Sequence, residues 1–400
     1  MKRFLRIIGI LAVAVLLLQI PFAYRACQVS TTANRIREAN VQSSPISGRF
    51  REYRGVMHVH SVHSGEISDS FDELLNAGCD NQLDFVMLTE HYSTAFDTSA
   101  LTLNGWYGST LYVAGNELNS RPGDRVLMVP GGPEAAGMRL KQTNEAIDEI
   151  HAKTSLAFVA YPEKFAAWDT AFDGVEVFNL NTELRAANPV VAALDYPWSG
   201  QVDRPLAISR YLTRPDANLR SFDEIAAKRK IVLTAGLDAH SAIGFHIFGD
   251  DLGQHLFGIK VDPYSDIFRI ARLHMLADPK SQLTRDSLIA ALKNGSFFVG
   301  FDVLGDTTGF RFSAEGSGQS QGMGAELNWV PGTKLRASSL IPARIVILKN
   351  GEKLAESSGA TELTADVTGP AAYRVEVYRE GLGLGFENVP WILSNPIYIR

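Results

Sequence analysis

Three of the nine histidines in this 400-residue chain lie close together, at positions 58, 60 and 63. On a β-strand, side chains two residues apart point to the same side, so His58 and His60 can face one metal ion together. His63 and Glu66 follow in a polar segment that can fold back over the same place. This spacing favours a metal site over a run of ordinary polar loop residues.

Three further apolar runs end in residues of the same kind. The first ends in Thr89-Glu90-His91, where His91 is a candidate ligand and Glu90 points away from it, placed to accept the N–H of an imidazole. The second ends in Glu117, whose carboxylate can bridge two cations. The third ends in Asp238 and His240, again two residues apart. Imidazole and carboxylate ligands suit Zn, Mn or Fe, so the pattern predicts a site for one of these ions.

The elements that must position these ligands alternate between β-rich runs and helical stretches. The predicted helices include Ser70–Cys79, Thr143–Lys153 and Ser221–Lys230. Alternating strands and helices predict parallel pairing. About seven such units over about 190 residues suit a (β/α) barrel, predicted to cover residues 51–302, with its active site at the C-terminal ends of the strands. The predicted strands are Arg54–Ser61, Leu83–His91, Thr110–Leu118, Arg125–Pro130, Leu156–Pro162, Gly174–Asn179 and Ile231–His240.

The pattern changes after Gly300. Short runs such as Arg344–Leu348 and Tyr373–Val377 alternate or are β-branched, and turn signals such as Lys349-Asn350-Gly351 separate them. Little in this region is typical of a helix. Residues 303–400 are therefore predicted to form a small β-sandwich that contributes no metal ligand.

The N-terminus is predicted to lie outside the fold. Residues 1–6 are basic, and the apolar run Ile7–Tyr24 is just long enough to cross a bilayer. Residues 1–27 are therefore a membrane anchor or a signal segment; cleavage and lipidation at Cys27 stay open as alternatives. Residues 28–50 are expected to be a tether. The expected location is membrane-anchored or exported, with the extracytoplasmic side favoured.

Composition narrows the classes of partner. A net charge of −6, without a basic run, argues against nucleic acid, which is bound by clustered Lys and Arg. Two cysteines, Cys27 and Cys79, are too few for a thiolate zinc site. The expected partners are a small-molecule substrate and, through the N-terminal segment, a membrane.

The ordered motifs H-x-H, T-E-H, G-x-E and D-x-H, each at a predicted strand end, resemble those of the PHP (polymerase and histidinol phosphatase) superfamily. Within it the chain is similar to the CehA/McbA-type metallohydrolases, whose C-terminal β domain ends much as Pro390–Tyr398 does here. The resemblance covers about residues 54–400. It implies an α/β fold, with a distorted (β/α)7 barrel that holds up to three metals and mostly hydrolyses phosphoesters. Some members split carbamates or other esters.

The resemblance also implies a ligand set. One metal would be bound by His58, His60, Glu117 and Asp238; another by His91 and His240, with Glu66 as a further loop ligand and His63 as its substitute. The chain departs from the family at positions 56, 125 and 161. Val56 replaces a frequent Asp, Arg125 stands where a His often lies, and Tyr161-Pro162 replaces His-Pro. Two divalent ions are therefore expected, and a third stays open.

The expected activity is a metal-dependent hydrolase, most of all a phosphoesterase that uses a metal-bound hydroxide on an anionic ester. Besides Glu117 and Asp238, the candidate catalytic residues are Arg125, which could hold a phosphate oxygen, and Tyr161, which could donate to that group or to the leaving oxygen. Lys164 and Arg210 are further candidates for an anion pocket. The alternatives are hydrolysis of a carbamate, carboxyl ester or amide, and a non-catalytic metal- or ligand-binding module.

Overall fold

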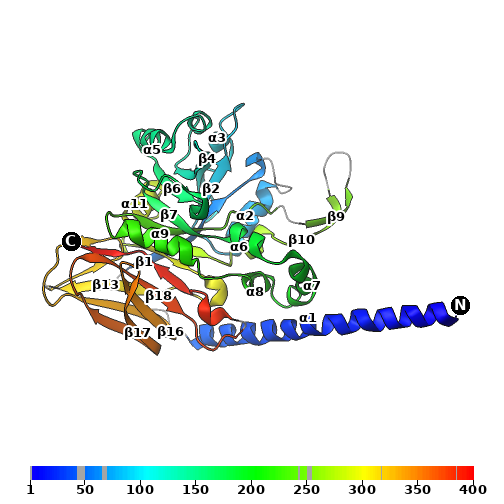
Figure 1. Cartoon of the computed structure of the whole chain (residues 1–400). Helices are drawn as coiled ribbons and strands as arrows, with labels where there is room; N and C mark the ends of the chain where they lie inside the picture. The colour runs from blue at the N-terminus through cyan, green and yellow to red at the C-terminus, as the bar shows by residue number, and fades with distance from the viewer. Residues whose placement is uncertain are drawn as a thin grey trace.

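The structure is a computed structural model of a mixed α/β protein with a large sheet and a long N-terminal helix (Figure 1). It describes residues 2–42, 50–64, 70–241, 244–249, 255–316, 318–383 and 385–400. Its longer helices are α1 (Lys2–Gln42), α2 (Phe71–Asp80), α5 (Thr143–Ala152), α6 (Leu180–Ala186), α7 (Pro189–Ser199), α8 (Arg204–Ser209), α9 (Asp216–Ala226) and α11 (Arg285–Asn294). The single-turn helices are α3 (Thr98–Leu101), α4 (Ala135–Met138) and α10 (Tyr264–Ile267).

Seven strands of the N-terminal part carry or adjoin the candidate ligands. They are β1 (Arg51–Val59), β2 (Phe85–His91), β4 (Thr110–Asn119), β5 (Arg125–Val129), β6 (Leu156–Ala160), β7 (Gly174–Asn179) and β8 (Val232–Gly236). The pairs β1–β2, β2–β4, β6–β7 and β7–β8 are parallel. Strand β5 is antiparallel to both β4 and β6. These strands are buried almost throughout, as expected where helices cover a parallel sheet.

The predicted (β/α)7 barrel is not evident in the sheet as a whole, which is extended and mostly antiparallel. One reason is the connection from Asn119 to Arg125, which is too short for the helical crossover that a parallel neighbour needs, so β5 runs back along β4. Another is that β1 also pairs with β11 (Arg272–Ala277), and β11 with β12 (Phe297–Gly300), both antiparallel. The α/β class is correct; the regular parallel barrel is not seen.

The predicted helices agree with the structure in place but differ in their ends. Helices α2 and α5 lie where Ser70–Cys79 and Thr143–Lys153 were predicted. Helix α9 begins at Asp216 and ends at Ala226, earlier than the predicted Ser221–Lys230. Among its described residues, the N-terminal part contains three further strands. They are β3 (Gly105–Tyr107), β9 (Gly244–Gly249) and β10 (His255–Lys260).

The C-terminal part contains strands and short 3-10 turns but no α-helix among its described residues. The strands are β13 (Arg311–Gly316), β14 (Gln319–Gly322), β15 (Glu326–Leu327), β16 (Lys334–Lys349), β17 (Glu352–Asp366), β18 (Ala371–Tyr378), β19 (Ile392–Ser394) and β20 (Ile397–Ile399). Strand β19 pairs with β12, and the side chain of Asn395 bonds the backbone of Leu233 in β8. The β part and the α/β part thus share one hydrophobic core.

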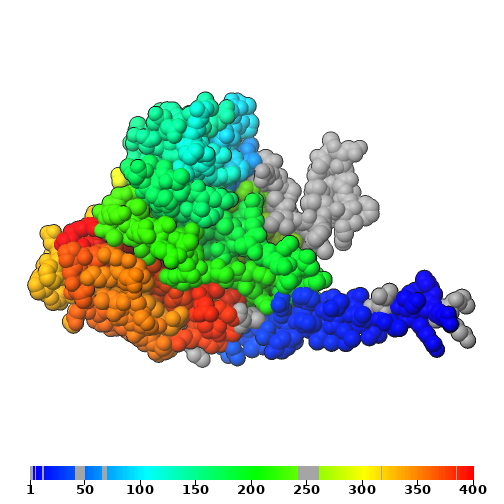
Figure 2. Space-filling model, viewed as in Figure 1, coloured from blue at the N-terminus to red at the C-terminus, as the bar shows by residue number. Residues whose placement is uncertain are grey.

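Helix α1 is longer than the predicted anchor. It continues as far as Gln42, so residues 28–42, which were expected to be a tether, are helical. Figures 1 and 2 show its N-terminal half projecting away from the body and its second half lying against it. The second half lies against the body because it carries a narrow apolar stripe at helical spacing. Ala26 and Val29 of this stripe are buried, and Ala33 and Ile36 pack on the core.

Candidate metal centre

The ends of β1, β2, β4 and β8 bring the candidate ligands together. The side chains of His58, His60, Glu117 and Asp238 are all buried, with at most 3% of each residue exposed. The backbone of His60 donates to Ala239, so the segment after β8 lies directly beside the end of β1. Residues from three segments that are far apart in sequence therefore form one buried polar cluster.

Four atoms of this cluster have the spacing of ligands around a metal ion. Nε2 of His58 lies 3.4 Å from Oε2 of Glu117 and 3.5 Å from Oδ1 of Asp238. Nε2 of His60 lies 3.4 Å and 3.3 Å from the same two oxygens. The edge of a tetrahedron with metal–ligand bonds of about 2.1 Å is about 3.4 Å. The donor set and its spacing thus fit a divalent metal ion.

The hydrogen bonds within the cluster are incomplete in a way that supports this fit. Among the described side chains, Nε2 of His60, Oδ1 of Asp238 and Nε2 of His240 are buried without a hydrogen-bond partner. Leaving such an atom unsatisfied costs on the order of 1–3 kcal/mol, so native proteins do it rarely. Cations at the two groups of possible ligands that contain these residues would satisfy them.

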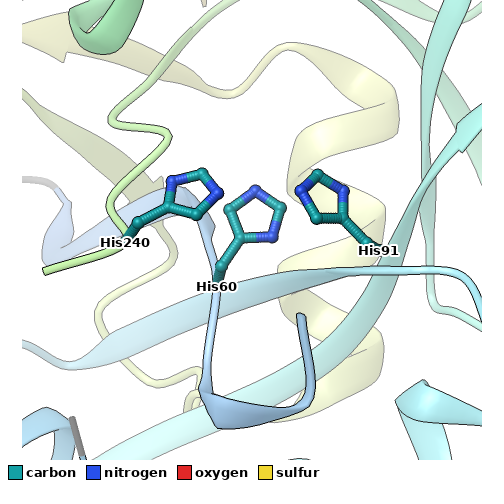
Figure 3. Close-up of side chains that lie close together, drawn as sticks. All are labelled: His60, His91 and His240. Carbon is teal, nitrogen blue, oxygen red and sulfur yellow. The ribbon is translucent and has the colours of Figure 1, made fainter. Parts of the chain in front are cut away.

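A second group of possible ligands consists of His60, His91 and His240 (Figure 3). The ring of His60 lies between the other two, with centroid distances of 4.2 Å to His240 and 4.4 Å to His91. Nδ1 of His60 bonds Ser64, so only Nε2 is left to bind metal. One imidazole nitrogen binds one ion, so Nε2 of His60 can serve only one of the two groups that contain it. Oε2 of Glu117 lies 3.2 Å from Nδ1 of His91, so this carboxylate contacts residues of both groups.

The backbone at the cluster is strained. His58, Tyr161 and Asp238 have φ angles of 60°, 50° and 49°, in the left-handed region that side chains with a Cβ rarely adopt. At His58 the register between β1 and β2 also shifts, so the two histidines do not follow simple strand alternation. Such conformations cost on the order of 1–3 kcal/mol each and concentrate at functional sites. They turn these side chains toward a common point.

The imidazoles are held by carboxylates that do not belong to the ligand group. Nδ1 of His58 lies 2.7 Å from Oε2 of Glu176 in β7. Gly236 makes room for this contact, since a Cβ there would lie 1.9 Å from the same oxygen. Glu90, predicted to accept an imidazole N–H, instead accepts from the hydroxyl of Ser64, which in turn lies 3.0 Å from Nδ1 of His60. Its support of the imidazole is therefore indirect.

The charges of the cluster suit metal binding. Burial alone would raise the pKa of Glu117, but His58, His60 and His91 outweigh it and hold this pKa well below its usual range. The pKa of Asp238 is likewise lowered, against burial, by the neighbouring histidines. Burial lowers the pKa of His60 to about 4. Ionised carboxylates and a neutral imidazole are the forms that bind metal.

His58 behaves differently from His60. Burial would lower its pKa, but Glu176 and Asp238 outweigh this effect and raise the pKa well above its ordinary value. Burial raises the pKa of Glu176 as well. Without a bound cation, the raised pKa favours a protonated His58. A cation at Nε2 would displace the proton there, and Nδ1 would keep its hydrogen and donate it to Glu176.

A cavity of about 220 Å³ opens beside the histidines. Three cationic side chains line it: Arg125, Lys164 and Arg185. The guanidinium of Arg125 is bonded to Oε1 of Glu117 at 2.5 Å, with 41% of the side chain exposed. The hydroxyl of Tyr161 donates to Oδ2 of Asp238 at 2.5 Å. Arg125 and Tyr161 thus hold ligand carboxylates as well as lining the cavity.

Not every predicted residue lies at the cluster. Glu66 falls outside the described residues. His63 contacts the rings of Phe71 and Phe96 and is in neither ligand group found among the described residues. Arg210 pairs with Asp195 and does not line the cavity.

Two residues at the cluster were missed by sequence reasoning. Glu176 lies in the buried run Gly174–Asn179, and an acid inside an apolar strand is a signal that could have found it. Asn181, whose amide donates to Asp238 at 3.0 Å, follows the same strand and had no such signal.

Comparison with known proteins adds little. No protein-family model matches the chain, and no curated protein matches it. Among solved structures, PsfC from Pseudomonas syringae PB-5123 is similar over 60% of this chain and 88% of its own, with 14% identity and a TM-score of 0.34.

Proposed function

We propose that this protein is a metal-dependent hydrolase of the PHP type, similar to the CehA/McbA metallohydrolases, and that its substrate is an anionic ester, most of all a phosphoester. The observation that carries the proposal is the convergence of His58, His60, Glu117 and Asp238 at metal-ligand spacing beside a cavity lined by three cations. Bound divalent ions would supply a nucleophile from water at neutral pH and stabilise charge on the reacting group.

We further propose that the seven strands β1, β2, β4, β5, β6, β7 and β8 form an irregular version of the (β/α)7 barrel. The bridge between Val59 and Ala239, together with the bond from Leu237 N–H to the carbonyl of Met57, supports closure between the first and last strand. The antiparallel β5 makes the ring irregular. In such a barrel the cluster would lie at the C-terminal end of the parallel strands, where these folds bind substrates.

The side chains around the cavity have separable roles in this proposal. Lys164 and Arg185 attract and hold an anionic group at the cavity rim. Arg125 uses one side of its guanidinium for Glu117, and its exposed remainder is available to a substrate oxygen. Burial and the nearby carboxylates raise the pKa of Tyr161, so its hydroxyl stays protonated and serves as a donor.

We propose two ions rather than one. The first would be bound by the four-residue group. The second would be bound by His91 and His240, bridged by the carboxylate of Glu117, because His60 has one free nitrogen and cannot serve both. Whether Zn, Mn or Fe is bound depends on supply as well as ligand type, since imidazole and carboxylate accept all three.

The test is to measure metal content of the purified full-length chain together with its activity on a phosphodiester, a phosphomonoester and a neutral aryl ester. His91→Ala should lose metal and phosphoesterase activity, whereas His63→Ala, a partly exposed histidine outside the ligand groups, should keep both. A metal-loaded protein that is inactive on all three substrates would leave a binding module as the better description. A protein without metal would contradict the proposal altogether.

A second function is favoured by a second cavity, of about 340 Å³, on the other side of Asn181 and Arg185. Leu180, Leu184 and Leu237 line it beside Asp238. An apolar wall next to the ligands suits an uncharged carbamate or carboxyl ester with a bulky apolar group. Preference for the aryl ester in the assay above would decide for this function.

Helix α1 is long and apolar enough to be a signal sequence or a membrane anchor. We propose that it is an uncleaved anchor, because the helix that begins in the apolar run continues without a break into the part that packs on the body. Cleavage near Cys27 would leave that packed part without its N-terminal turns.

A further inference from the structure

Helix α7 exposes an apolar face that carries no charge. Val190, Leu194, Trp198 and the following Val202 recur at intervals of four residues, with 66%, 42%, 42% and 43% of each exposed. The one charged residue of the helix, Asp195, is buried and bonded to Arg210. The outer face of a helix on a soluble protein ordinarily carries charged or polar residues, so this face requires an apolar or amphipathic partner.

The position of α7 along α1 indicates what that partner is. Helix α7 packs against α1 (Figure 1). Nε1 of Trp198 donates to Oε1 of Gln19 at 2.9 Å. On the N-terminal side of Gln19, large apolar side chains whose exposure is described are exposed, such as Ile10 at 69% and Leu16 at 67%. The exposed apolar surface of α1 therefore continues directly onto α7.

The depth of this contact matches a membrane surface. The last aliphatic residue of the apolar run of α1 is Ala23, four residues beyond Gln19 or roughly 6 Å along the axis. Amphipathic helices that lie on bilayers bury their apolar face about 5–10 Å into the boundary between head groups and acyl chains. Tyr24 and Arg25 follow at the level of the head groups, where Tyr, Trp and basic residues gather.

We propose that the exposed face of α7 is a second membrane contact, which lies in the surface of the same bilayer that α1 enters. A bilayer is favoured over a second copy of the chain as the partner of α7. A single bilayer can cover the exposed apolar surfaces of α1 and α7 together. The proposal requires that α1 is retained, and it does not depend on metal chemistry. One consequence is that α6, which carries Asn181 and Arg185 of the cavity rim and leads directly into α7, is held near the membrane surface.

The test uses the full-length chain in proteoliposomes. In a background with Cys27→Ser and Cys79→Ser, an environment-sensitive fluorophore is attached to Val190→Cys, and nitroxide-labelled lipids serve as quenchers. The matched control is Val330→Cys, an exposed valine of the C-terminal β part. We expect a blue-shifted emission at position 190. Quenchers placed shallow in the bilayer should remove most of this emission. Emission at position 330 should stay that of a water-exposed probe and should not be quenched.

Three outcomes would overturn the proposal. The first is emission at position 190 that is as water-exposed and as weakly quenched as at position 330. The second is a probe at 190 that is shielded from water but not quenched by lipid, since a protein surface then covers α7. The third is a mature chain that, by mass spectrometry of protein from cells, begins after Gln19.

Discussion

Nδ1 of His58 lies 2.7 Å from Oε2 of Glu176, and both side chains are completely buried. The pair joins β1 to β7 and turns Nε2 of His58 toward Glu117 and Asp238. A carboxylate that accepts the N–H of a ligating imidazole fixes the orientation of the ring and raises its basicity. Glu176 is therefore the residue that should set the metal affinity of the first site without touching the ion.

Glu176→Gln should lower metal affinity by roughly 10–100-fold, the usual effect of removing such a partner. The amide keeps the volume but replaces a charged acceptor by a neutral one. Titration calorimetry with Zn²⁺ or Mn²⁺ measures the change. Glu183→Gln, on α6 and bonded to Thr213, is the control and should bind metal normally. Equal affinity in both variants would show that the contact with His58 has no part in metal binding.

Gly236→Ala should disturb the same contact from the backbone. The new Cβ would lie 1.9 Å from Oε2 and 2.4 Å from Cδ of Glu176, and 2.8 Å from Cβ of His58. Because all these atoms are buried, the substitution should lower the free energy of unfolding by about 1–3 kcal/mol, as overpacking does, and weaken metal binding. Gly137→Ala, where nothing lies within 4 Å of the added atom, is the control in denaturant unfolding. Equal free energies of unfolding in the two variants would contradict this prediction, because the neighbours of Gly236 would then have shifted without cost.

Asp238→Asn should remove metal and activity together, since Oδ1 of Asp238 faces both histidines of the first group. The wild-type protein should lose thermal stability on addition of a chelator, because an ion present at about 100 times its Kd stabilises the native state by about 2.7 kcal/mol. The Tm of the variant should be indifferent to the chelator. A wild-type Tm that does not respond either would contradict a bound metal.

Arg125→Ala should raise KM for an anionic ester about tenfold or more, in line with roughly 1.5–3 kcal/mol for a hydrogen bond to a charged group. KM for a neutral aryl ester should change little, which makes the second substrate the control. Since Arg125 also bonds Glu117, metal content must be measured alongside the kinetics. An equal loss on both substrates, with metal lost as well, would mean that Arg125 serves the ligand and not the substrate.

His274 should make stability depend on pH through contacts with Glu52 and Asp302, neither of which belongs to the candidate metal cluster. Burial would lower its pKa, but Asp302 and Glu52 outweigh it and raise the pKa to about 9 from 6.5. The native state then binds a proton that the unfolded chain releases above pH 6.5, so this contribution is complete below pH 6.5 and is lost as pH rises toward 9. It amounts to at most roughly 3 kcal/mol. In His274→Gln, unfolding measured across this range should lose that part of its pH dependence; an unchanged slope would refute it.

The sequence by itself determined which residue types lie at the ends of the strands. His58, His60, Glu117 and Asp238 could be named because each ends a run that is apolar enough to be buried, and the local period places such residues at strand ends. The same local signals located α2 and α5 and separated the mixed N-terminal part from the β-rich C-terminal part. They also marked the apolar start of α1.

Only the tertiary structure decided what surrounds those candidate ligands. The contact between His58 and Glu176 spans 118 positions, and that between Tyr161 and Asp238 spans 77, so no local period carries either. The antiparallel course of β5, the docking of residues 26–40 of α1 and the exposed face of α7 likewise depend on which segments meet in space. Periodicity reports which face of an element is apolar; packing between distant elements decides what that face, or a polar group within it, will contact.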